Sequence, residues 1–236
     1  LTANGWHPSM LKKCKLQNKK ASVILVHGLW MNGMEMSLLK HRLNRFGYQS
    51  WSFRYSSTRL GLAEIANRLN TFVEQIPAKT IHFVGHSLGG LVVLKLFEVF
   101  PRQRPGRVIA LSPPYQGSET ARRLIRLPCG RNLIGRSITQ LLKGDVPAWS
   151  GERDLGVIAG ILNFGFGRLI GAVGRSGDGT IRLEEMRIPE ARDFITLRVS
   201  HMGLVVSRKV ATETYHFLEH GRFSTVSSTM TGFTSR

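Results

Sequence analysis

Short β-branched apolar runs alternate along this chain with longer segments of helical periodicity, and this alternation constrains the fold more than any other feature. Strands that alternate with helices in this way join into a mainly parallel sheet with helices on its faces. The sequence therefore predicts an α/β protein with a mostly parallel central sheet flanked by helices. The expected strands are 22–27, 48–55, 80–84, 107–111, 155–160 and 194–199, and the expected helices are 34–46, 62–76, 88–100 and 204–220.

The length of 236 residues suits one compact domain, so residues 1–236 are expected to form a single unit. Residues 114–153 lack a strand pattern and are rich in arginine, which predicts a short basic cap or lid insertion above one edge of the sheet. Residues 224–236 are rich in Ser and Thr and are expected to form a mobile tail. Residues 155–174 are apolar enough to imitate a membrane span, but an arginine and six glycines argue against one.

The charge balance indicates which partners the chain can attract. Lys and Arg number 33 against 15 Asp and Glu, a net charge of +18 that favours polyanions or an anionic membrane surface. The cations are scattered apart from one dense run at 12–20, and no nucleic-acid-binding motif accompanies them, so no specific nucleic acid is expected. Only Cys14 and Cys129 are present, which excludes a disulfide scaffold and a zinc ribbon. Neither a signal peptide nor a transmembrane segment is expected, and a cytoplasmic or peripherally membrane-associated location is favoured.

The segment with the clearest chemistry is the pentapeptide Gly85-His86-Ser87-Leu88-Gly89, a G-x-S-x-G pattern between an expected strand and an expected helix. A sharp strand-to-helix turn would expose the Ser87 hydroxyl, and the glycines would let the helix and strand cross closely. The helix N-terminus would offer free N–H groups to a developing oxyanion. We therefore interpret Ser87 as a catalytic nucleophile, although an ordinary serine in a glycine-rich turn is the alternative.

A serine nucleophile needs a general base, and the base needs a carboxylate that orients it. His201 stands between the last expected strand and the last expected helix, at the same sheet edge as Ser87, and is the predicted base, with a merely structural loop histidine as the alternative. Asp178 lies in a Gly-Asp-Gly turn after the fifth expected strand and is the predicted orienting acid, with a purely turn-stabilising aspartate as the alternative. Asp193 precedes the last strand and so lies at the opposite edge.

The oxyanion hole should consist of two backbone N–H groups. Leu88, directly after the nucleophile, is one predicted donor, and Leu29, after the first strand, is the other, with Trp30 as the near alternative. His27 is expected to shape this loop through hydrogen bonds and to take no direct part in the chemistry. No metal or organic cofactor is implied.

Seven motifs together resemble the lipase/esterase branch of the α/β-hydrolase superfamily. The resemblance covers roughly residues 20–221 and is closest to bacterial triacylglycerol-lipase-like proteins and to the group related to the enzyme that deacylates inositol in GPI anchors. It implies an α/β-hydrolase fold and a nucleophile, acid and base at Ser87, Asp178 and His201. The motifs are VILVHGLW, FRYSSTR, HFVGHSLGGLV, SPPYQGS, GVIAG, GDGTI and VSHMGL.

The expected function is that of a serine carboxylic-ester hydrolase, an esterase or lipase, acting on an acyl ester or a lipid. An acyltransferase or thioesterase with the same triad, or a non-catalytic protein that binds anionic lipid, are the alternatives. Trp30 and Met31 are expected to contact the acyl group, since thioethers and an indole suit an adaptable apolar pocket. Met34 and Met36 are further candidates for this pocket, with helix packing as the alternative. Phe164, Phe166 and Leu169 are candidates for a second apolar wall, although a buried loop is the more expected role. Arg54 and Arg59 are candidates for contact with an anionic headgroup, with simple solvation as the alternative.

Overall fold

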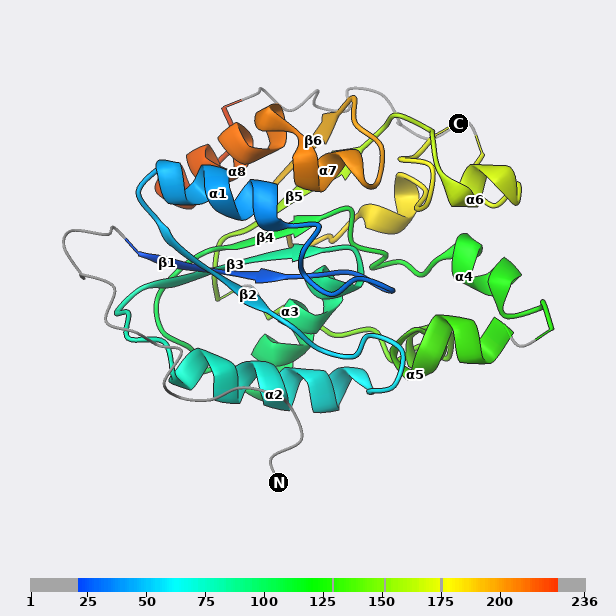
Figure 1. Cartoon of the computed structure of the whole chain (residues 1–236), viewed down its shortest axis with the longest axis horizontal. Coiled ribbons are helices and arrows are strands. Elements are labelled where there is room, and N and C mark those ends of the chain that lie inside the picture. Colours follow the sequence, from blue (N-terminus) through cyan, green and yellow to red (C-terminus); the bar gives the residue numbers. More distant parts are fainter. Residues whose placement is uncertain (1–20, 129, 151, 175, 225–236) are drawn as a thin grey trace, which may run out of the picture.

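Six parallel strands form the centre of the computed structural model, which describes residues 21–224 except 129, 151 and 175 (Figure 1). Their order in the sheet is β2-β1-β3-β4-β5-β6, and every neighbouring pair is parallel. The predicted α/β class with a parallel central sheet is confirmed. The strands are β1 (Ser22–Val26), β2 (Gln49–Phe53), β3 (Ile81–His86), β4 (Val108–Leu111), β5 (Leu155–Gly160) and β6 (Asp193–Leu197).

Helices cover both faces of the sheet (Figure 1). One face carries α1 (Ser37–Arg45), α7 (Gly203–Val206) and α8 (Arg208–His220), and the other carries α2 (Leu62–Glu74) and α3 (Leu88–Val99). The single helix expected over 204–220 is wrong, because the backbone of Ser207 is extended and the Ser207 hydroxyl accepts the N–H of Val210 as the N-cap of α8. Shorter elements join the strands: α4 (Glu119–Leu124), α5 (Gly130–Leu142), α6 (Phe166–Leu169) and the 3₁₀ helix η2 (Glu184–Met186).

The central strands are buried on both faces, which is why they appear in the sequence as continuous apolar runs. In β1, Ile24 and Val26 pack into the core beneath α2 and α3, whereas Val23 and Leu25 pack into the core beneath α1 and α8. All four side chains are at most 1% exposed. The alternation along one strand thus builds two hydrophobic layers, and these fix the sheet between its helices.

The order of the strands reverses beside β1. The chain leaves β1 for β2 on one side and then crosses back to β3 on the other side. In an open parallel sheet, such a reversal opens a crevice at the carboxyl ends of the two strands, and ligands bind there. A functional site is therefore expected where β1 and β3 end.

The segment between β4 and β5 contains α4 and α5 and lies at the carboxyl-end edge of the sheet (Figure 1). The Ser137 hydroxyl donates to the Leu60 carbonyl at 2.6 Å, and the Arg136 N–H donates to the Thr58 carbonyl at 3.0 Å. These bonds tie α5 to the loop after β2. Most of residues 114–153, which were expected to form a cap, lie at this edge of the sheet.

The apolar stretch 155–174 divides between β5 and α6. Across the described ranges, no helix has the length and apolar character to cross a membrane. The basic run 12–20 and residues 225–236 of the expected tail lie outside the described residues.

Candidate active site

Ser87 occupies a strained turn between β3 and α3. Its φ of 54° and ψ of −123° are rare for a residue with a side chain, and its N–H is held by the Leu111 carbonyl at 2.8 Å. A Cβ on Gly85 would lie 2.5 Å from the carbonyl oxygen of Gly89 and the nitrogen of Gly90, so only glycine fits there. The flanking glycines thus let α3 begin close against the strand, with Ser87 at the helix N-terminus.

His201 and Asp178 are brought together at this edge, 23 positions apart in sequence. His201 Nδ1 lies 2.6 Å from Asp178 Oδ2, and the His201 backbone N–H donates to the Asp178 carbonyl at 2.9 Å. The short side-chain contact requires a proton on Nδ1, which leaves Nε2 as the basic nitrogen. Neither Nε2 of His201 nor the Ser87 hydroxyl has a hydrogen-bond partner among the described residues.

Asp178 is completely buried and is held as a carboxylate by its surroundings. Burial by itself would raise its pKa, but the His201 imidazole and the N–H groups of Ile181 and Thr180 together lower the pKa. These two N–H groups donate to Oδ1 at 2.8 and 3.0 Å, within the turn that the sequence predicted. Oδ2 is therefore left to face His201.

His86 supports His201 from beneath, a contact that the sequence did not indicate. His86 Nε2 donates to the His201 carbonyl at 3.0 Å, and the two ring centroids are 4.7 Å apart. Burial, followed by the nearby His201, lowers the pKa of His86 to about 3. A neutral His86 thus ties the backbone of His201 to the residue that directly precedes Ser87.

The loop after β1 approaches the same turn. A Cβ on Gly28 would lie 3.1 Å from Ser87 Cβ and 3.3 Å from Met31 Sδ, so Gly28 lies close to both Ser87 and the Met31 thioether. Within the described part of the chain, the N–H groups of Leu29 and Leu88 have no hydrogen-bond acceptor. In contrast, the Trp30 N–H donates to the Ser57 hydroxyl at 3.0 Å, so Leu29 is the better candidate donor.

His27 and Tyr55 hold this loop in shape. His27 Nδ1 donates to the Gly28 carbonyl at 2.9 Å, while the Tyr55 hydroxyl donates to the His27 carbonyl at 2.7 Å. The two rings stack with centroids 4.2 Å apart, and burial lowers the pKa of His27. His27 thus has the supporting contacts that the sequence predicted, whereas Tyr55 and Ser57 were missed because their contacts span 27 or 28 positions.

The expected acyl-contacting residues occupy different environments. Met36 is buried in the core beside α1, so it has the packing role that was its alternative, whereas Met34 is exposed. The Trp30 indole is half exposed and donates to the Leu133 carbonyl at 2.7 Å, which joins the loop after β1 to the start of α5. The buried loop expected around Phe164 is wrong: Phe164 and Leu169 are 76% and 85% exposed, and Phe166 is also exposed. Arg54 and Arg59 are exposed, as simple solvation requires.

The other aspartates lie elsewhere. Asp145 is paired with Lys95, Asp154 with Arg107 and Arg192, and Asp193 accepts the N–H of Phe223. No three His, Cys, Asp or Glu side chains are grouped as metal ligands within the part of the chain that the structure describes. Asp178 is thus the aspartate that meets a histidine at the Ser87 edge.

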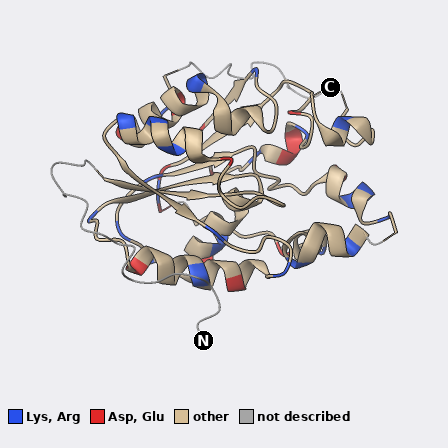
Figure 2. Cartoon of the chain, viewed as in Figure 1, with Lys and Arg blue, Asp and Glu red and all other residues tan. Residues whose placement is uncertain are grey.

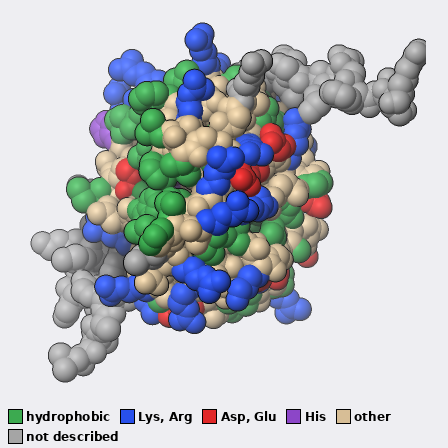
Figure 3. All heavy atoms as spheres, turned by 90° about the vertical axis from the view of Figure 1, so that its right-hand side faces the viewer, with side chains coloured by type: hydrophobic (Ala, Val, Ile, Leu, Met, Phe, Trp, Pro, Cys, Tyr) green, Lys and Arg blue, Asp and Glu red, His purple; other side chains and the backbone are tan. Residues whose placement is uncertain are grey.

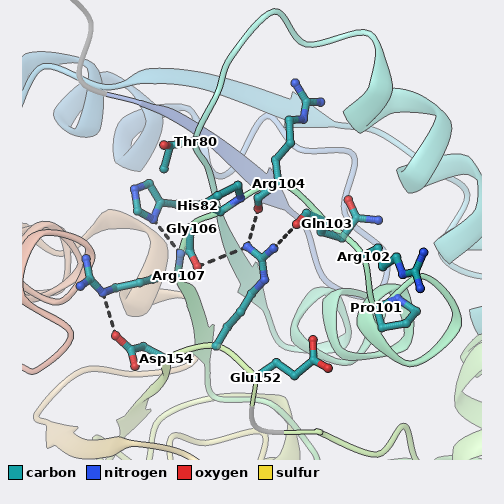
Figure 4. Close-up of a pocket in the computed structure, with 12 residues that line it drawn as sticks. Thr80, His82, Pro101, Arg102, Gln103, Arg104, Gly106, Arg107, Glu152 and Asp154 are labelled. Atoms are coloured by element: carbon teal, nitrogen blue, oxygen red, sulfur yellow. Dashed lines mark hydrogen bonds and ion pairs between the residues drawn. The ribbon is translucent and has the colours of Figure 1, made fainter.

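A cavity of about 970 Å³ lies at the opposite edge of the sheet, where β3, β4 and β5 begin (Figure 4). Two of the arginines that line it are already engaged: Arg107 pairs with Asp154 at 3.0 Å, and the Arg153 guanidinium donates to the carbonyls of Gln103, Arg104 and Gly106. These bonds stabilise the β3–β4 connection. His82 lines this cavity at the start of β3, whereas Ser87 follows the end of that strand, so the cavity is separate from the candidate site.

A parallel sheet with a strained serine after one strand, and a buried Asp–His pair after two later strands, defines a protein of the α/β-hydrolase type. The model of the alpha/beta hydrolase family matches residues 23–199, and the chain belongs to this family. This match confirms the resemblance to the α/β-hydrolase superfamily that the sequence motifs indicated. A search of curated proteins finds no match.

Solved structures with a similar fold include lipases and esterases. The mature form of a lipase from Bacillus licheniformis superposes with a TM-score of 0.68 at 16% identity, covering 85% of this chain and 91% of that one. A metagenomic carboxyl esterase gives a TM-score of 0.59 at 18% identity, covering 78% of this chain and 65% of that one. An esterase from Exiguobacterium antarcticum gives 0.59 at 13% identity, covering 86% and 93%. At these identities the likeness shows a shared fold.

Proposed function

We propose that the chain is a serine carboxylic-ester hydrolase in which Ser87, His201 and Asp178 form the catalytic triad. The observation that supports this proposal is the buried Asp178–His201 pair, 2.6 Å apart, which His86 joins to the strained turn of Ser87 through its bond to the His201 carbonyl. A serine kept at a positive φ stores backbone strain, and such strain is typical of functional sites.

In the proposed reaction, the Ser87 oxygen attacks the ester carbonyl while His201 Nε2 accepts the hydroxyl proton. The C–O bond to the leaving alcohol then breaks, and His201 returns the proton to that alcohol. A water molecule, deprotonated by His201, attacks the acyl-enzyme and releases the carboxylic acid and the free serine. The carboxylate of Asp178 stabilises the imidazolium that forms in each half of the reaction.

The N–H groups of Leu29 and Leu88 are proposed to form the oxyanion hole. Both groups lack a partner in the described part of the chain, and Leu88 begins α3, so the positive end of the helix dipole adds to its hydrogen bond. Removing one such donor typically costs about 10²–10³ in kcat, so the two together carry much of the catalysis.

The proposed substrate is an acyl ester or a lipid. Met31, whose sulfur lies against Gly28 beside Ser87, is proposed to contact the acyl chain, with Trp30 at the mouth of the site. α4 and α5 are proposed to act as a cap over this mouth, because the Trp30 indole and the loop after β2 hold α5 there.

The test is a series of p-nitrophenyl esters of increasing acyl length, assayed with wild type and Ser87→Ala. Turnover should disappear in Ser87→Ala and persist in Ser207→Ala, a matched serine-to-alanine change at the cap of α8. A folded wild type that hydrolyses none of the esters would contradict the proposal. An acyl thioester, and an added alcohol as acceptor, distinguish an ester hydrolase from a thioesterase or an acyltransferase.

A further inference from the structure

The face around the Ser87 edge exposes large apolar side chains from several separate loops. Trp30 follows β1, Leu133 lies in the first turn of α5, Leu162, Phe164 and Leu169 follow β5, and Met202 follows β6. We call these six residues the apolar rim. They lie at one edge because the carboxyl ends of parallel strands meet there. Figure 3 shows this face, with apolar side chains gathered in a strip over it.

The side chains of the apolar rim are strongly exposed to solvent. Leu169 is 85% exposed, Phe164 is 76% exposed and Trp30 is 56% exposed. Large apolar side chains gathered on one face of a soluble domain typically mark a surface that contacts an apolar partner. Because the rim includes Trp30 and Met202, the neighbours in sequence of Leu29 and His201, this surface borders the candidate active site.

Unpaired arginines accompany the rim. Arg126, Arg131, Arg136 and Arg168 are exposed, and none of them has a carboxylate partner within the described ranges. Glu119, the acid on α4, is already engaged by Arg122 and Arg123. Figures 2 and 3 show Lys and Arg on the helices of this end and beside the apolar strip. The face therefore combines apolar contact area with excess positive charge.

We propose that this face docks on a bilayer that contains anionic phospholipid. Aliphatic and aromatic rim side chains can enter the boundary of the acyl chains while the arginines remain with the phosphates, which is the usual arrangement at a membrane surface. Leu162 and Leu169 have no flat face on which a nucleic-acid base could stack, so the rim favours lipid over nucleic acid. The docking itself does not depend on the proposed function. Only the further step, in which a lipid ester of the docked membrane is the substrate, rests on it.

The test measures binding of the full-length Ser87→Ala protein to phosphatidylcholine vesicles with and without phosphatidylglycerol, since this variant should leave the lipid intact. Binding should be at least about tenfold tighter with phosphatidylglycerol and should weaken with added salt. In this background, Arg126→Gln with Arg168→Gln should weaken binding roughly 25-fold, because each arginine near an anionic surface contributes about fivefold. Lys79→Gln with Arg102→Gln, at the opposite edge, should change it less than about twofold.

A second pair of matched variants tests the contribution of the apolar rim to vesicle binding. Leu169→Asp should weaken binding at least about fivefold, whereas Val99→Asp, an equal change in charge at the far end of α3, should have little effect. Equal effects of the two members of either pair would overturn the proposal, as would binding to an oligonucleotide without binding to anionic vesicles. Failure of the proposed function would appear separately, as a wild type that binds vesicles but hydrolyses no soluble ester.

Discussion

The substitution Gly85→Ala tests whether the geometry of the turn, and not merely the presence of Ser87, produces activity. The new Cβ would lie 2.5 Å from two backbone atoms of α3, about 0.9 Å short of the 3.4 Å at which ordinary contact begins. Backbone atoms cannot rotate away as a flexible side chain can, so β3 and the start of α3 must separate by a comparable distance. A misplacement of about 1 Å at a reacting group can cost roughly hundredfold in rate.

We therefore expect Gly85→Ala to lower kcat/KM for p-nitrophenyl butyrate by about two orders of magnitude. Stability should fall by about 1–3 kcal/mol, the usual cost of overpacking, so the variant should remain folded below its lowered Tm. The matched control is Gly174→Ala, since a Cβ there meets nothing within 4 Å and φ is not positive. Wild-type turnover in folded Gly85→Ala would refute the reasoning.

Three further predictions concern the proposed catalytic acid, the buried histidine His82 and a helix cap. Asp178→Asn should lower kcat by about 10³–10⁴, since the amide favours the wrong His201 tautomer, whereas the exposed Asp145→Asn should retain activity, as steady-state kinetics would show. Burial lowers the pKa of His82 to about 4, so the unfolded chain binds a proton near pH 6.5 that the folded chain refuses until about pH 4. The free energy of unfolding should therefore fall on acidification through this window by up to about 1.4 kcal/mol per pH unit for this histidine. Urea titrations at several pH values should show that the free energy of unfolding of His82→Gln changes less with pH than that of the wild type. Ser207→Ala should lower the free energy of unfolding by about 1 kcal/mol through loss of the α8 cap, and an unchanged urea midpoint would contradict that role.

Features carried by local pattern could be predicted from the sequence. The buried strand 155–160 was predicted with the bounds that β5 has, because an apolar run begins directly after the charged residues Arg153 and Asp154. Asp178 and His201 could be selected because each lies in a loop at the carboxyl end of a strand, where a parallel sheet gathers its functional side chains.

Contacts between distant segments could not be predicted. Ser57 and Tyr55 hold the loop after β1 across 27 and 28 positions, and no spacing rule connects them to it. The exposure of Phe164 and Leu169 was misjudged because burial depends on which elements pack over a loop, not on the hydropathy of its residues. The break at Ser207 carries neither proline nor glycine, so helical periodicity continued through it.

Labelling with a fluorophosphonate tests the central claim most directly, because this reagent phosphonylates an activated serine without requiring the correct ester. The account predicts one covalent adduct, located by mass spectrometry on the peptide that contains Ser87, and no adduct in Ser87→Ala. Labelling should also fall sharply in Asp178→Asn, which keeps the serine but disturbs its base. A folded wild type that stays unlabelled, or a label that persists in Ser87→Ala, would contradict the assignment of Ser87 as the nucleophile.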